Sequence, residues 1–107
     1  MFYNTTGEKG ELLAHYLKTA KGQDKTILTL FLKNAELKLT PFEVQAKLAL
    51  RSYNYPITSI RRSINTLTRE GFLTMLDEKR VGRYGRPNHL WKVADSYQSN
   101  AIDFSHE

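Results

Sequence analysis

Apolar residues recur at helical spacing in the first third of the chain and predict two helices. Between Glu8 and Lys21 they occupy positions i, i+1, i+4, i+5 and i+8, which form one stripe along a helix: Leu12, Leu13, Tyr16, Leu17 and Ala20. Gly22 is expected to end this helix. Asp24 is expected to cap a second helix that runs to about Leu37 around the apolar run ILTLFL. That run would also fit a buried strand, but the length of the span and the polar residues that follow it favour a helix.

The segment LTPFEV carries the strongest local signal for the start of a helix. Thr40 is a favoured N-cap residue, Pro41 fits the first helical position, and Glu43 stands where it completes a capping box. Leu39 and Val44 occupy the positions of a hydrophobic staple. We therefore expect a third helix from Thr40 to about residue 50, where the stretch RSYNYP ends it because a residue before proline disfavours helical geometry.

A fourth helix is expected from Ile57, and its two faces differ in character. Its narrow apolar face consists of Ile57, Ile60, Ile64 and Leu67. We expect Ile60, Ile64 and Leu67 to be buried against Val44, Leu48 and the second helix, with Trp91 at one end. Thr58 or Ser59 is expected to cap the start of the helix, and Gly71 to follow its last turn. The opposite, polar face consists of Arg61, Arg62, Asn65, Thr66 and Arg69.

After Gly71 the apolar spacing changes from helical to alternating, which predicts a β-hairpin. FLTML and HLWKV fit two strands, with Trp91 and Val93 on the opposite side from Lys92. The intervening DEKRVGRYGRPN holds two glycines and a proline, so we expect a flexible, basic tip. Residues 95–107 lack periodicity and end in acidic residues, which indicates a tail.

The order of these elements and their residues resemble a winged helix-turn-helix domain. ITSIRRSINTLTREGFL resembles the recognition helix and following strand of bacterial winged-helix regulators, and VGRYGRPNHLWKV resembles their wing. The resemblance implies a mainly α fold with a C-terminal β-hairpin wing. It divides the chain into an N-terminal extension with an amphipathic helix (1–23), the winged domain (24–94) and an acidic flexible tail (95–107). The connection 51–56 departs from the pattern, because it lacks the usual glycine and contains two tyrosines; a longer turn is expected there.

Positive charge is concentrated in the part of the chain that carries the resemblance. The whole chain has a net charge of +5, whereas residues 51–92 contain all seven arginines and have a net charge of +6. Arginine suits phosphate oxygens and guanine edges, because its planar fork donates two parallel hydrogen bonds. A solvated basic face would give the same composition, but the placement of the arginines on the expected recognition helix and wing favours DNA binding.

The expected recognition helix, residues 58–70, fits the major groove of DNA with its first turns nearest the base edges. Residues 57–69 contain no acid, so Arg61 and Arg62 have no carboxylate one turn further along the helix. The residues expected to contact DNA are Thr58, Ser59, Arg61, Arg62, Asn65, Thr66 and Arg69.

The expected wing, residues 79–88, is predicted to contact the DNA backbone or the minor groove. Its glycines allow the main chain to approach phosphate closely, and arginine is favoured in narrow minor grooves. The candidate contacts are Lys79, Arg80, Arg83, Tyr84 and Arg86. A solubilising loop is the alternative interpretation. Thr40, at the start of the third helix, is a further candidate phosphate contact.

Composition and motifs argue against other classes of protein. The chain has no cysteine, which excludes disulfides, thiolate zinc sites and a cysteine nucleophile. No apolar run approaches 18 residues and the first residues lack the features of a signal peptide, so we expect neither a membrane span nor secretion. His15, His89 and His106 lack metal-ligand spacing, and no paired carboxylates stand out. We therefore expect no metal, no cofactor, no small-molecule ligand and no enzymatic activity.

The sequence thus predicts a protein that binds double-stranded DNA: a small cytoplasmic, nucleoid-associated transcription regulator of bacterial, phage or plasmid origin. One alternative is a winged-helix module that binds protein as an adaptor or inhibitor. Another is a replication-initiator or RNA-binding module. The apolar stripe of the first helix must also be buried, either against its own domain or against the same helix of a second copy. A homodimer formed through that helix would present two recognition helices to successive half-sites.

Overall fold

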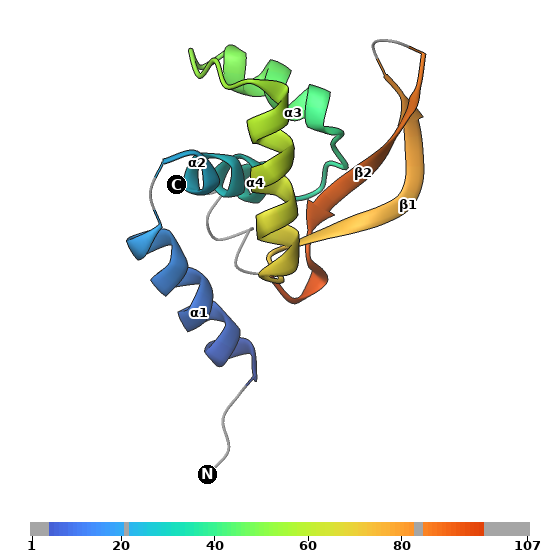
Figure 1. The fold of residues 1–107 in the computed structure, drawn as a ribbon. Helices are drawn as coiled ribbons and strands as arrows, with labels where there is room; N and C mark the ends of the chain where they lie inside the picture. The colour runs from blue at the N-terminus through green and yellow to red at the C-terminus, as the bar shows by residue number, and fades with distance from the viewer. Residues whose placement is uncertain (1–4, 21, 83–84, 98–107) are drawn as a thin grey trace.

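Four helices and a two-stranded antiparallel hairpin make up the fold in the computed structural model, which describes residues 5–20, 22–82 and 85–97 (Figure 1). In chain order the elements are α1 (Thr5–Thr19), α2 (Gly22–Lys33), α3 (Pro41–Ala49), α4 (Ile57–Arg69), β1 (Leu73–Val81), β2 (Pro87–Val93) and a short 3-10 helix (Asp95–Tyr97). In Figure 1, α4 crosses the front of the molecule, the hairpin lies to its right, and α1 extends away from the body. The expected fold class, mainly α with a C-terminal hairpin, is confirmed.

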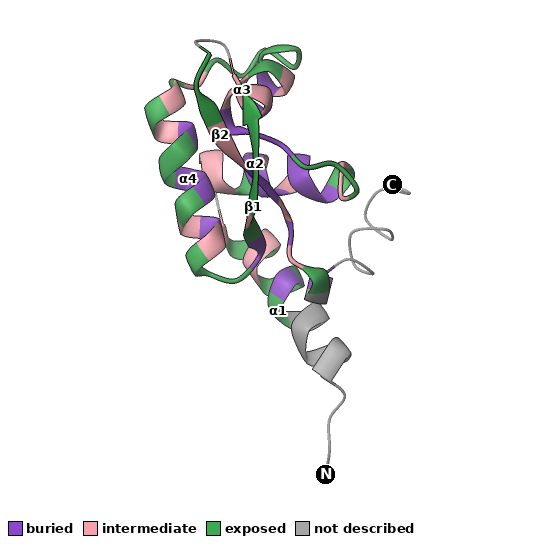
Figure 2. Ribbon diagram, turned by 90° about the vertical axis from the view of Figure 1, so that its right-hand side faces the viewer, coloured by how far each residue is buried: buried purple, intermediate pink, exposed green. Residues whose placement is uncertain are grey.

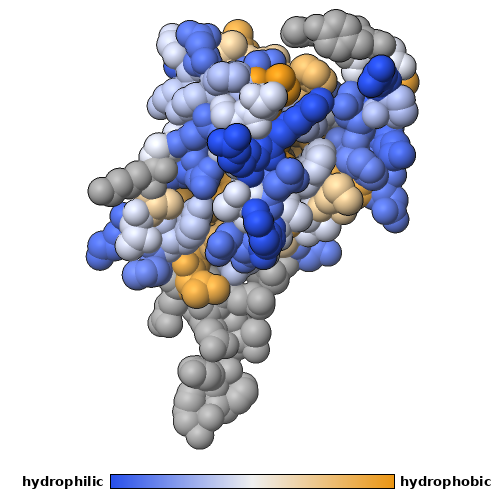
Figure 3. Space-filling view, viewed as in Figure 1, coloured by the Kyte–Doolittle hydropathy of each residue, from blue (hydrophilic) through white to orange (hydrophobic). Residues whose placement is uncertain are grey.

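Three residues of the apolar face of α4 are buried at the centre of the core, as predicted, whereas Ile57 is half-buried. Ile60, Ile64 and Leu67 are at most 1% exposed, and so are Val44 and Leu48 of α3. The side chains of α2 that complete this core are Ile27, Leu28, Leu30, Phe31 and Leu32. Figure 2 follows the buried stripe along α4, and in Figure 3 the surface over α4 is hydrophilic. The helix therefore separates an apolar interior from a polar outer face.

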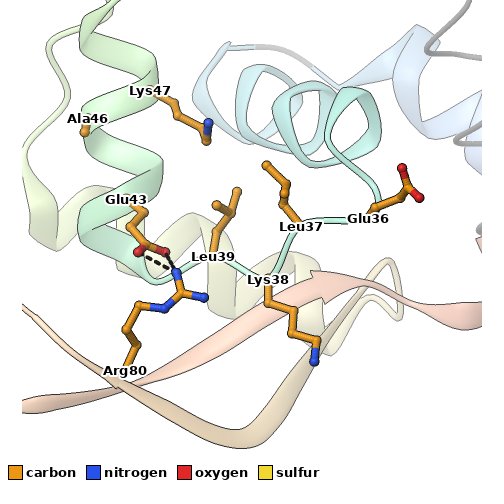
Figure 4. Close-up of a pocket in the computed structure, with 8 residues that line it drawn as sticks. All are labelled: Glu36, Leu37, Lys38, Leu39, Glu43, Ala46, Lys47 and Arg80. Carbon is orange, nitrogen blue, oxygen red and sulfur yellow. Dashed lines mark hydrogen bonds and ion pairs between the residues drawn. The ribbon is translucent and has the colours of Figure 1, made fainter.

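The start of α3 has the geometry that its sequence predicts. The Glu43 backbone N–H donates to the Thr40 hydroxyl (3.2 Å), and the Thr40 backbone N–H donates to the Glu43 carboxylate (2.9 Å). The same carboxylate accepts hydrogen bonds from Arg80 on β1 at 2.7 and 2.6 Å (Figure 4). The capping box is confirmed, and the ion pair with Arg80 joins the hairpin to α3.

The sequence predicted the C-terminal end of α4 correctly but not its N-terminal cap. Gly71 has a φ of +92°, and the N–H of Phe72 donates to the Leu67 carbonyl (3.0 Å), so the helix ends as expected. The expected N-cap is wrong, because Pro56 occupies that position and no side chain caps the helix. Ser59 is the third residue of the helix, so it lies inside the first turn and not at the cap, and its hydroxyl donates to a side chain of α2.

The second helix is shorter at its C-terminal end than predicted. It ends at Lys33 instead of Leu37, and the Asn34 side chain donates to the Leu30 carbonyl (2.8 Å) in the turn that follows. Leu39 then exchanges two backbone hydrogen bonds with Trp91 of β2 at 2.8 and 2.9 Å. The chain must leave the helix early because Leu39 has to reach the hairpin. The start of α2 at Gly22 also replaces the expected cap at Asp24.

In the connection between α3 and α4, a serine adopts the left-handed backbone conformation that a glycine usually occupies. Ser52 has a φ of +70°, a conformation that costs an L-residue roughly 1–2 kcal/mol. The N–H groups of Ser52 and Tyr53 donate to the carbonyls of Ala49 and Leu48, each at 3.0 Å. These bonds extend the end of α3 by a turn, which agrees with the longer connection that the sequence predicts.

The hairpin is more regular than its glycine-rich sequence predicts. β1 continues to Val81, with Leu73 opposite Val93 and an interruption of the register between Leu76 and Lys79. Lys79 and Arg80 therefore lie on a strand instead of in a flexible tip. The tip itself is closed by a hydrogen bond from the Gly82 N–H to the Arg86 carbonyl (2.9 Å). Cross-strand pairing outweighs the low strand propensity of DEKR because it satisfies the backbone groups.

Residues on both sides of the predicted winged domain contribute to its core. Leu13 of α1 is buried, and the Tyr16 ring lies 4.7 Å from the ring of Phe72. Tyr97, in the segment expected to be a tail, is 3% exposed, and the centre of its ring lies 5.2 Å from the centre of the Phe72 ring. The start of the tail is thus structured, because burying an aromatic ring outweighs the cost of ordering a few residues. Residues 98–107 lie outside the described part of the chain.

Truncation of Leu67 tests the placement of the core. We expect Leu67→Ala to lower the free energy of unfolding by about 2–5 kcal/mol, since it removes a fully buried side chain at the centre of α4. Leu50→Ala is the matched control, because Leu50 is 87% exposed and its truncation should change stability by less than about 0.5 kcal/mol. Urea unfolding followed by circular dichroism measures both values. Equal losses of stability in the two variants would contradict the burial of the Leu67 face of α4.

The carboxyl group of Glu43 has a lowered pKa. Burial acts to raise it, but the hydrogen bond from the Thr40 backbone N–H and the bonds and charge of the Arg80 guanidinium outweigh burial and hold the pKa below 4.5. A carboxyl group whose pKa is lower in the folded state stabilises the fold above its unfolded pKa. That contribution is lost as the pH falls through the lower, folded value.

The capping ion pair should therefore make stability depend on pH. Glu43→Gln keeps a side-chain oxygen for the Thr40 N–H but loses the charge that pairs with Arg80. We expect the variant to be less stable than the wild type near neutral pH and the difference to shrink as the pH falls below about 4.5. Glu36→Gln, at an exposed acid, is the control. Urea unfolding over a pH series measures the difference, and a gap independent of pH would contradict the role of the charge.

Candidate nucleic-acid interface

The outer face of α4 carries most of the polar residues that the sequence singled out. Thr58, Arg61, Arg62, Asn65 and Arg69 are exposed, whereas Ser59 and Thr66 are half-buried. Within the described part of the chain, the salt bridges are Lys38–Glu78, Arg80–Glu43 and Lys92–Asp95, and none involves α4. The arginines of α4 therefore have no ion-pair partner among the described residues, and the surface over this helix is hydrophilic (Figure 3).

Helical spacing divides this face into a centre and two flanks. Thr58, Arg62 and Arg69 lie opposite the buried stripe and point directly outward. Arg61 lies on the flank toward α3, where its guanidinium carbon is 5.3 Å from the centre of the Phe42 ring. Ser59 lies on the other flank, toward α2. The predicted residues are thus close together in space but face three different surroundings.

Gln23 of α2 fixes the first turns of α4, and sequence reasoning gave it no role. Its side-chain NH₂ donates to the Ser59 carbonyl (2.7 Å) and to the Ser63 hydroxyl (2.9 Å). Its side-chain oxygen accepts from the Ser59 hydroxyl (3.1 Å). No local pattern marks Gln23, because its partners are 36 and 40 residues away. Ser59, a predicted DNA contact, is thereby engaged within the fold.

The predicted wing residues differ in whether they form ion pairs. Lys79 and Arg86 are exposed, and neither forms a salt bridge with a described residue. Arg80 is also exposed, but its guanidinium is bonded to Glu43. Arg83 and Tyr84 lie outside the described residues. Sequence reasoning did not foresee the pairing of Arg80, since Glu43 had already been assigned to the capping box.

The structure does not support Thr40 as a phosphate contact. Its side chain is buried, with 3% of the residue exposed, and its hydroxyl accepts the Glu43 N–H. The neighbouring Leu39 is paired with Trp91, which holds this end of α3 against the hairpin. The N-terminus of α3 is therefore covered by the protein itself.

A hollow of about 520 Å³ lies beside Arg80 and has mixed charge (Figure 4). Its lining residues are Glu36, Leu37, Lys38, Leu39, Glu43, Ala46, Lys47 and Arg80. Two carboxylates line it, and one of them already neutralises Arg80. This hollow is larger than those beside α4, yet its acids make it unsuited to a polyanion.

The described residues offer neither a metal site nor a membrane span. The described segments contain no group of three or more histidine, aspartate or glutamate side chains that could hold a metal ion. Over the described residues, no helix combines the length and the apolar character that a membrane span requires.

Comparison with known proteins finds similarity in structure but not in sequence. No protein-family model and no curated protein matches the chain. The structure of the circadian clock associated protein Pex from Anabaena matches with a TM-score of 0.59 at 19% identity, over 90% of this chain and 88% of Pex. The proposed transcriptional regulator TA0346 from Thermoplasma acidophilum gives 0.57 at 20% identity, over 78% of this chain and 80% of the other.

A third similar structure was determined in complex with DNA. Bacillus subtilis PadR in complex with operator DNA matches with a TM-score of 0.53 at 14% identity, over 74% of this chain and 46% of PadR. All three proteins are of the winged-helix type. In this chain α3, the connection after it and α4 form the helix-turn-helix, and β1 and β2 form the wing. The protein has the winged helix-turn-helix fold.

Proposed function

We propose that this protein binds double-stranded DNA as a small transcription regulator, with α4 in the major groove and the wing on the backbone or in the minor groove. The observation that carries the proposal is the outer face of α4. It presents three exposed arginines, Arg61, Arg62 and Arg69, that form no salt bridge with a described residue. An uncompensated cationic helix on a rigid scaffold suits a polyanion whose groove admits a helix.

Individual contacts follow from where each side chain points. Arg62 and Asn65 lie in the middle of α4 and are exposed, so they are the candidates for reading base edges: arginine pairs bidentately with guanine and asparagine with adenine. Thr58 and Arg69 flank them on the same face. Ser59 and Thr66 are less suited, because they are half-buried.

The wing supplies contacts that do not depend on sequence. Lys79 and Arg86 are exposed on the hairpin, and with Arg83 and Tyr84 they remain the candidates for the backbone or minor groove. Arg80 contributes indirectly, since its bond to Glu43 holds the hairpin against α3. Phosphate contacts of this kind fix the register of a protein on DNA and supply much of its affinity.

The structural comparisons support the proposal at the level of fold. PadR, a protein of similar fold, was determined in complex with operator DNA, and TA0346 is itself a proposed transcriptional regulator. A regulator of this kind would act in the cytoplasm on the nucleoid of a bacterium, or on a phage or plasmid. A protein-binding adaptor and a replication-initiator or RNA-binding module are the alternatives that the experiment must separate.

Gel-shift titration of a random-sequence duplex at 50 and 200 mM salt tests the proposal. We expect binding at low salt and a loss of affinity on the order of a thousandfold at high salt if about six phosphates are contacted. Arg62→Glu with Arg69→Glu should abolish binding. Lys25→Glu with Lys33→Glu, on the exposed side of α2, changes the net charge equally and should bind nearly as well as the wild type.

Two results would contradict DNA binding. Failure to bind any duplex at 50 mM salt would favour the protein-binding alternative. Tighter binding to a structured RNA of equal length would favour the RNA-binding alternative. Selection from a random duplex pool then identifies the preferred site of a protein that passes the first test.

We further propose that the protein forms a homodimer through α1. Leu13, Tyr16 and Leu17 pack against the protein's own core, but Leu12 on the outer side of the helix is 56% exposed. The helix extends from the body of the molecule, so a second copy has access to it (Figure 1). Pairing would double the phosphate contacts of one copy and offset its modest charge.

Sedimentation equilibrium at tens of micromolar tests the dimer. We expect the mass of two chains for the wild type and of one chain for Leu12→Glu, because a carboxylate would be placed in the apolar contact. Ala14→Glu, at an exposed position on the opposite flank of α1, is the control and should behave as the wild type. A wild-type monomer that binds DNA one copy at a time would exclude the dimer.

A further inference from the structure

Two adjoining hollows lie between α4 and the wing. One, of about 350 Å³, is lined by Phe42, Arg61, Arg86 and Asn88. The other, of about 260 Å³, is lined in part by Arg61, Asn65, Asn88 and His89. Both contain Arg61 and Asn88, so they form one groove, called here the helix–wing groove.

The charge of the helix–wing groove is of one sign. Arg61 contributes a cation from α4 and Arg86 a cation from the wing, and no carboxylate lines either hollow. Asn88 adds an amide whose NH₂ group donates to the Arg86 carbonyl (3.2 Å), which orients it at the base of the tip. A groove that offers two guanidinium groups and no acid selects an anion with several acceptor oxygens.

Arg61 is held in this groove by its stacking on α3. Its guanidinium carbon lies 5.3 Å from the centre of the Phe42 ring, within the range of a cation–π contact. A guanidinium over a ring face keeps the N–H donors at its edge available, because the contact uses the flat side of the group. Phe42 therefore fixes Arg61 without neutralising it.

The position of the groove identifies which part of DNA it would meet. A sugar–phosphate strand separates the major groove from the minor groove of B-DNA. If α4 occupies one and the wing meets the other, that strand must pass between them. The helix–wing groove is the space it would cross.

We propose that the helix–wing groove binds the sugar–phosphate strand between the two DNA grooves, with Arg61 and Arg86 as its phosphate ligands and Phe42 as the residue that positions Arg61. The proposal rests on the proposed DNA-binding function and assigns different tasks to neighbouring arginines. Arg61 contacts the DNA backbone and does not contribute to sequence preference, whereas Arg62 contacts a base edge.

Alanine variants of three arginines separate these tasks. On the selected duplex and on a scrambled duplex of equal length, Arg61→Ala should lose about tenfold in affinity on both and lower the salt slope by about one. Arg62→Ala should lose about fivefold to 150-fold on the selected duplex and relax the preference for one base pair. Arg51→Ala, which removes an exposed arginine on the α2 side of the connection, is the charge control and should change neither affinity appreciably.

Neutralising single phosphates locates the contact. Methylphosphonate is placed at each backbone position of the selected duplex in turn, and the wild type should lose affinity at the positions it contacts. At one of these positions the methylphosphonate should not lower the affinity of Arg61→Ala any further, while it should lower the affinity of Arg62→Ala by the same factor as that of the wild type. Equal sensitivity of wild type and Arg61→Ala at every phosphate, or a relaxed base preference in Arg61→Ala, would overturn the assignment.

The role of Phe42 is tested by its coupling to Arg61. Phe42→Leu keeps an apolar side chain but removes the ring face, so it should weaken binding to both duplexes in the wild-type background and have no effect in the Arg61→Ala background. Thermal unfolding of each variant confirms that it is folded at the assay temperature. An equal loss in both backgrounds would mean that Phe42 does not act through Arg61. Failure of the wild type to bind any duplex would instead overturn the proposed function itself, and this inference with it.

Discussion

The burial of one face of α4 is the constraint on which the rest of the structure depends. Ile60, Ile64 and Leu67 are almost fully buried against α2 and α3, so the rotation of the helix about its axis is fixed. Each residue advances the direction of the side chain by about 100°, and that rotation directs Arg62 and Arg69 to solvent. Turning the helix by one position would bury a guanidinium without a partner, which costs several kcal/mol. The apolar core thus determines the geometry of the charged face.

Features that depend on a few neighbouring residues could be predicted from the sequence. The capping box needs only Thr40 and Glu43, and the helix end at Gly71 needs only a residue that tolerates a φ of +92°. The face of α4 follows from apolar spacing over little more than ten residues. The capping and helix-end signals each lie within about one helical turn, and the apolar spacing of α4 repeats over about three turns, so a short stretch of sequence carries all three.

Features that depend on distant partners could not be predicted in the same way. Ser59 has the chemistry of an N-cap, but Gln23, 36 residues earlier, engages its hydroxyl. Arg80 has the chemistry of a DNA ligand, but Glu43 accepts its hydrogen bonds from 37 residues away. Tyr97 lies in a segment without periodicity and is nevertheless buried against Phe72. The sequence indicates which groups need a hydrogen-bonding, ionic or apolar partner, whereas only the tertiary fold determines which partners lie within reach.

The contrast between Arg80 and Arg61 shows how one side-chain type acquires two roles. A carboxylate that caps α3 neutralises Arg80, so the ion pair holds the wing against the helix-turn-helix. An aromatic ring that follows the same cap supports Arg61 without cancelling its charge. Both partners, Glu43 and Phe42, belong to the first turn of α3, so one helix start fixes the wing on one side and a cationic side chain on the other. The separation of α4 and wing is therefore set before any ligand arrives, and a binding surface organised in advance loses less entropy on association.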